Sequence, residues 1–115
     1  MLRISHHAVG VTRGSAVLFS AYEDGGLMWT GEGPRMERQR ISFDEPFLAP
    51  PVVHVSIAMW DIEGGTNQRA DISADQITPE GFDIVFRTWG DTRVARIRAD
   101  WLAIGQVLHD EDWDI

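Results

Sequence analysis

Four residues have side chains that could hold the hydroxyl groups of a sugar: Glu32, Asn67, Arg69 and Trp89. A hydroxyl both donates and accepts hydrogen bonds, so a carboxylate paired with an arginine or an amide can bind two neighbouring hydroxyls. The apolar face of a pyranose packs well on a large, rigid aromatic ring. A second interpretation stays open, in which Trp89 fills one end of the fold and Arg69 pairs with Asp71 or Asp91.

Other chemical patterns in the sequence are weak. His6 and His7 are neighbours, so in a strand they point to opposite faces and cannot easily share one ion. The acidic tail 110–115 lacks the glycine and the terminal bidentate glutamate of an EF-hand loop. The GxSxG nucleophile elbow, the P-loop, the GxGxxG turn and HExxH are all absent. We therefore predict no bound metal, no cofactor and no enzymatic activity.

Length and charge exclude several classes of protein. A chain of 115 residues with 43% hydrophobic residues favours one domain with a single core. The formal net charge of -8 argues against binding to nucleic acid or to an anionic membrane surface. The chain has no cysteine, and it shows neither a signal peptide nor an apolar run long enough to span a bilayer. We expect a soluble chain, and the sequence leaves its location open.

All ten basic residues are arginines. Arg87, Arg93, Arg96 and Arg98 would gather into a repulsive cluster if their segments were adjacent antiparallel strands. Two interpretations stay open: an exposed face whose ion pairs contribute little, or a ladder between the subunits of a homo-oligomer.

Alternation of apolar and polar residues, the pattern of half-buried strands, dominates the chain. We expect six strands, at 16–21, 37–43, 52–60, 69–73, 82–89 and 93–104. Within 82–89, Phe82, Ile84 and Phe86 share one face, which places Trp89 on the opposite face and disfavours a core position for it.

Turn residues separate these segments. Gly90-Asp91 suits a tight hairpin turn, 78–81 reads Thr-Pro-Glu-Gly, and 64–67 is a longer connection. The glycine-rich segment 24–34 is expected to be a loop, and we expect no helix of ordinary length. Together these signals predict an antiparallel β-sandwich.

Four segments, taken together, resemble the H-type lectin domain family. They are ISFDEPFLAPPVVHVSI, the run from Asp61 to Arg69, ITPEGFDIVFRTWGDTRV and ADWLAIG, and they span about 31–105. The resemblance implies a six-stranded antiparallel β-sandwich that assembles as a homotrimer, with hexamers as an open alternative. It divides the chain into an N-terminal part at 1–30, the lectin-like sandwich at 31–105 and an acidic tail at 106–115.

The resemblance also implies sites for galactose or N-acetylgalactosamine glycans between neighbouring protomers. Arg69 is similar to an arginine that reaches the sugar across the protomer boundary, and Trp89 to a tryptophan that lines the site. Glu32 stands where the family has a shorter aspartate, Gly90 where better-known members have a histidine, and Ala95 where they have an aromatic residue. The predicted sugar-binding residues are therefore Glu32, Gly33, Arg69, Trp89 and Gly90. The alternative is a trimeric module for adhesion or fibre assembly whose sugar site is degraded.

Overall fold

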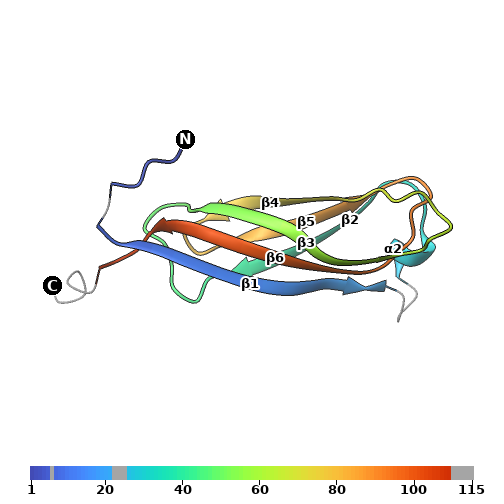
Figure 1. Cartoon of the computed structure of the whole chain (residues 1–115), viewed down its shortest axis with the longest axis horizontal. Coiled ribbons are helices and arrows are strands. Elements are labelled where there is room, and N and C mark those ends of the chain that lie inside the picture. Colours follow the sequence, from blue (N-terminus) through green and yellow to red (C-terminus); the bar gives the residue numbers. More distant parts are fainter. Residues whose placement is uncertain (6, 22–25, 110–115) are drawn as a thin grey trace.

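Two three-stranded antiparallel sheets pack face to face in the computed structural model of the chain (Figure 1), which describes residues 1–5, 7–21 and 26–109. The strands are β1 (Val9–Ser20), β2 (Arg35–Ser42), β3 (Val52–Ile62), β4 (Asp71–Thr78), β5 (Gly81–Thr88) and β6 (Val94–Gln106). One sheet has the order β1-β6-β3 and the other β2-β5-β4. The predicted six-stranded antiparallel sandwich is confirmed.

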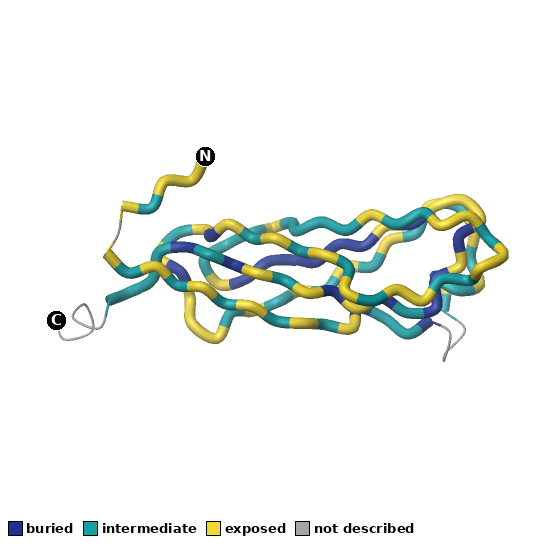
Figure 2. The backbone as a smooth tube through the Cα atoms, viewed as in Figure 1, coloured by how far each residue is buried: buried dark blue, intermediate teal, exposed yellow. Residues whose placement is uncertain are grey.

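The core lies between the two central strands. Phe82, Ile84 and Phe86 of β5 are fully buried, and they share a cluster with Ile97 and Ala99 of β6. Figure 2 shows buried, dark blue stretches of backbone in the interior of the sandwich. β5 is the most buried strand because both of its faces are covered: Val85, on the face away from the core, is also fully buried.

The turn at Gly90-Asp91 joins the two sheets. We predicted a hairpin between its flanking strands, and that prediction is wrong, since β5 pairs with β2 and β4 whereas β6 pairs with β1 and β3. Each strand is central in its own sheet, so neither has a free edge for the other. The 78–81 turn does form a hairpin, with Thr78 opposite Gly81.

Arg87 does not join the arginines of β6 in one cluster, because β5 and β6 lie in different sheets and the condition for the cluster is not met. Arg87 projects from the sheet β2-β5-β4 towards Asp71, at 3.9 Å, whereas Arg96 and Arg98 belong to β6 in the other sheet. Arg93 lies in the segment that connects β5 to β6, and its Nε is 3.6 Å from Oε2 of Glu63.

β1 begins at Val9, well before the predicted start at residue 16. The inward positions of its first half include Gly10 and Gly14, which give no apolar signal. A Cβ at Gly10 would come within 2.5 Å of Val107, and one at Gly14 within 2.6 Å of the Trp101 ring. Side chains from elsewhere therefore fill the space that β1 leaves, and the alternation that predicts a strand is lost.

The glycine-rich segment contains a single helical turn, α2 (Leu27–Thr30), where we expected only a loop. Met28 is 5% exposed and belongs to the core cluster, and Trp29 packs against that cluster. β4 also differs from the prediction, since it starts at Asp71 instead of residue 69 and continues to Thr78.

Candidate functional site

The five predicted site residues lie at one end of the sandwich, where the loops before β2 and after β5 meet. The N–H of Gly33 donates to the carbonyl of Gly90 at 2.9 Å, which joins the two loops. Glu32 precedes Gly33, and Trp89 precedes Gly90 in the chain. The guanidinium of Arg69 covers Gly90, with Nη1 at 2.9 Å from the position that a Cβ there would take. One protomer therefore gathers all five residues.

Arg69 forms an ion pair with Asp91, whose Oδ1 lies 2.7 Å from Nη1. This bears out one part of the second interpretation of the sequence, in which Arg69 pairs with a nearby aspartate. Desolvation raises the pKa of Asp91, but hydrogen bonds from Arg69 and Asn67 outweigh it and leave the pKa below its usual value. The pair is a fixed donor beside a fixed acceptor, and both side chains remain open to solvent.

Two buried threonines hold the backbone around Arg69. Thr88 Oγ1 donates to the Arg69 carbonyl at 2.6 Å, and Thr92 Oγ1 accepts from the Arg69 N–H at 3.1 Å. Thr92 Oγ1 also donates to the carbonyl of Asn67 at 2.5 Å. Since Thr88 and Thr92 are fully buried, these bonds fix Arg69 without competition from water.

Arg35 ties the neighbouring loop to the same turn. Its guanidinium donates to the carbonyls of Gly33 at 2.9 Å, Met28 at 3.1 Å and Gly90 at 3.2 Å. Desolvation lowers the pKa of Arg35, and the nearby charge of Glu32 opposes that shift. Arg35 positions the loop that carries Glu32 and Gly33, and its donors are used by backbone carbonyls.

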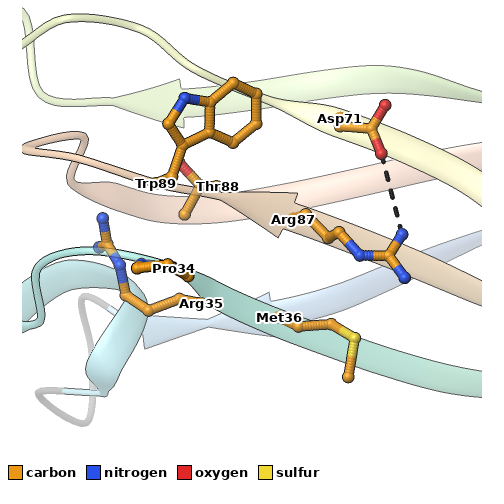
Figure 3. A pocket seen from close by; sticks show the side chains of 7 residues that line it. All are labelled: Pro34, Arg35, Met36, Asp71, Arg87, Thr88 and Trp89. Atoms are coloured by element: carbon orange, nitrogen blue, oxygen red, sulfur yellow. Dashed lines mark ion pairs between the residues drawn. The ribbon is translucent and has the colours of Figure 1, made fainter.

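A shallow groove of about 390 Å³ starts at Trp89 and follows the surface of the sheet β2-β5-β4. Its lining residues come from the start of β2, the start of β4 and the end of β5: Pro34, Arg35, Met36, Asp71, Arg87, Thr88 and Trp89. Figure 3 shows Trp89 at one end of the groove and the Arg87–Asp71 pair further along the strands. Trp89 is 45% exposed, so it is not a buried plug that fills this end of the fold.

Sequence reasoning proposed Arg69 and Trp89 as site residues but gave no role in the site to Asp91, Thr88, Thr92 or Arg35. The sequence offered Asp71 and Asp91 as possible partners of Arg69, and the structure shows that Arg69 pairs with Asp91. Ala95 is 4% exposed, so it lies in the core and not on the surface of the site.

We predicted that the chain has no metal site and no membrane-spanning segment, and the structure describes only part of the residues concerned. Within 1–5, 7–21 and 26–109, three or more possible metal ligands nowhere come together, whereas His6 and the tail from residue 110 lie outside the described residues. No helix in this part of the chain is long and apolar enough to cross a membrane.

A β-sandwich with an arginine–carboxylate pair, an exposed tryptophan and a shallow groove at one end is a module suited to noncovalent ligand binding. Residues 38–104 match the family model of the H-type lectin domain. The chain belongs to this family, whose members are carbohydrate-binding lectins in general, and the resemblance seen in the sequence is confirmed.

Two known proteins are similar to the chain in sequence. The chain is 59% identical over its full length to "ATP synthase subunits region ORF 7" of Fuscovulum blasticum, covering 99% of that protein. It is 36% identical over 75 residues to a discoidin-1 chain of Dictyostelium discoideum, covering 64% of this chain but only 30% of that protein.

Among solved structures, discoidin II of Dictyostelium discoideum shares the fold, with a TM-score of 0.75 and 24% identity. The match covers 91% of this chain and 40% of the discoidin II chain.

Proposed function

We propose that the chain binds glycans ending in galactose or N-acetylgalactosamine at the cluster formed by Arg69, Asp91 and Trp89. Arg69 donates to sugar hydroxyls, the Asp91 carboxylate accepts from them, and Trp89 packs against the apolar face of the ring. The observation that carries the proposal is the 2.7 Å Arg69–Asp91 pair beside a 45% exposed tryptophan, in a chain of the H-type lectin family.

We propose further that these sites lie between the protomers of a trimer. Glu32 is exposed and forms no ion pair within the described residues, so its carboxylate is available to a sugar shared with an adjacent copy. Gly33 leaves space beside this carboxylate, since nothing lies within 4 Å of the position that a Cβ there would take. A shallow site buries little of a sugar, so each site binds weakly and several linked sites give avidity.

Replacement of Arg69 by alanine tests the sugar site. Calorimetry with galactose and N-acetylgalactosamine should show millimolar binding to the unchanged chain and an affinity at least about tenfold lower for Arg69→Ala, because charge-assisted hydrogen bonds are lost. Glu80→Ala, an exposed change in the β4–β5 turn, is the control and should bind normally. No binding of either sugar to the unchanged chain at millimolar concentration would refute the proposal.

The second candidate is an assembly module, and the outer face of the sheet β1-β6-β3 favours it. Val11 and Val52 are 65% and 52% exposed, and both lie opposite Ile104 of the central strand. Sugar binding separates the candidates: a lectin binds galactose and loses it in Arg69→Ala while it keeps its trimer, whereas an assembly module forms the trimer but binds no sugar.

A further inference from the structure

The groove extends beyond the residues that the proposed sugar site uses. Only Trp89 belongs to both, and the groove continues from it along the strands to Met36, Asp71 and Arg87. Its volume of about 390 Å³ lies within the range of small-ligand pockets, roughly 300–1,000 Å³. Met36 is 52% exposed and gives the groove a second apolar surface, opposite Arg87 on the neighbouring strand.

The two arginines of the groove differ in how their donors are used. Arg35 gives its hydrogen bonds to carbonyls of neighbouring loops. Arg87 has a single ion-pair contact within the described residues, 3.9 Å to Asp71, which is longer than a hydrogen bond. Both of these side chains are about half exposed, at 48% and 55%. The donors of Arg87 and the acceptors of Asp71 are therefore open to a ligand.

Arg38 and Arg40, further along the same sheet, are paired more closely than Arg87 is. On the same sheet, Arg38 and Asp83 form a close pair at 2.7 Å, and Arg38 also reaches Asp75 at 3.1 Å. These charged side chains use one another's donors and acceptors, so few of these groups remain for a ligand. The Arg87–Asp71 pair places one donor group and one acceptor group along the groove with no net charge, which matches a neutral ligand rich in hydroxyls.

We infer that the groove is a second subsite, which holds the neutral sugar residue next to the terminal galactose of an oligosaccharide. Trp89 connects the two subsites because it lines the groove and also precedes Gly90, the residue that the Arg69 side chain covers. The second sugar packs on Met36 and Trp89, and its hydroxyls bond to Arg87 and Asp71. This inference rests on the proposed sugar site and names the larger glycan that the site selects.

Calorimetry with methyl β-galactoside and with lactose tests the second subsite. Lactose should bind about threefold to tenfold more tightly than the monosaccharide, the gain expected from a few exposed hydrogen bonds and one packed ring face. Arg87→Ala and Met36→Ala should each reduce this preference to about twofold or less while leaving the affinity for methyl β-galactoside unchanged. Arg93→Ala, an arginine of equal exposure outside the groove, should keep the preference.

The outcomes separate this inference from the function on which it rests. Equal binding of both sugars by the unchanged chain, or a lactose preference that survives in Arg87→Ala and Met36→Ala, overturns the second subsite and leaves the first intact. Failure of both sugars to bind overturns both. The preference should also persist in about 0.5 M NaCl, since salt screens charge–charge attraction and a neutral sugar has none. If the preference is lost in salt, the second subsite depends on charge–charge attraction, and its assignment to a neutral sugar is wrong.

Discussion

At Gly90 the backbone has a φ of +69°, a conformation that strains L side chains, and the guanidinium of Arg69 lies directly over it. The arginine occupies the space that a side chain at this position would need. From there it reaches Asp91, while Thr88 and Thr92 hold its backbone. A glycine thus provides room for the ion pair on which the proposed sugar site depends.

Alanine at Gly90 should therefore change the site as well as the stability. We expect Gly90→Ala to cost about 1–2 kcal/mol through its backbone conformation and to displace the flexible end of Arg69 from Asp91. Gly33→Ala is a matched control, because Gly33 has a φ of +73° but nothing within 4 Å of the added Cβ. Both variants should lose similar stability in thermal melts, but only Gly90→Ala should shift the Arg69 Nε–H signal in NMR spectra. An unchanged signal would contradict the steric argument.

Single residues could be predicted where the signal was local. Strand alternation placed Trp89 opposite Phe86, and its 45% exposure bears this out. Asp91 was named only as one of two possible partners of Arg69, and the bond from Thr92 to Asn67 was missed. In both cases the two residues lie more than twenty positions apart in sequence. Contacts of this kind depend on how the loops meet, which no periodic pattern records.

Among the strands, β2, β5 and β4 are joined across their outer face by a charge network. Arg38 of β2 donates to Asp83 of β5 at 2.7 Å and to Asp75 of β4 at 3.1 Å, and Arg40 contacts Asp83 at 3.3 Å. The hydrogen bond from Arg38 is the largest influence on the pKa of Asp83. Together with Arg40 it outweighs desolvation and lowers the pKa below its usual value.

This lowered pKa predicts a pH-dependent contribution to stability. A carboxylate whose pKa falls on folding stabilises the protein above its unfolded pKa of about 4, and the contribution is lost as the pH falls through the folded value. Asp83→Asn should lower the melting temperature at pH 7 by about 5 °C. The difference from the unchanged chain should shrink towards about pH 3. Glu80→Gln, at an exposed carboxylate with no ion pair among the described residues, should show neither effect.

The strands themselves were predictable to different degrees. β3 and β5 were predicted almost to their ends because large apolar residues alternate along them. The first half of β1 was missed because Gly10 and Gly14 lack the apolar side chains that mark a strand. The side chains of Val107 and Trp101 fill the space beside them. The pairing of β5 with β6 was predicted wrongly, since a short turn can join strands within one sheet or between two, and its sequence alone does not distinguish these cases.

At the scale of the whole molecule, the outer face of the sheet β1-β6-β3 exposes apolar side chains that a second chain would bury. Val11, Ile104 and Val52 form one apolar row across all three strands. Further along the same face, Arg98 and Asp100 form no ion pair among the described residues. A second copy of the chain could cover the row and supply opposite charges, so this face is where we place the proposed trimer contact.

A charge at one end of the apolar row should prevent that assembly. Light scattering should give about three times 12.9 kDa for the unchanged chain and a single chain mass for Val11→Glu, because an unpaired carboxylate in an apolar contact is costly. Met36→Glu is the matched control, since Met36 is similarly exposed but lies on the other sheet, and it should remain a trimer. If the sugar sites lie between protomers, monomeric Val11→Glu should also lose galactose binding. A monomer that binds galactose normally would place the whole site in one chain, and a trimeric Val11→Glu would move the contact to another face.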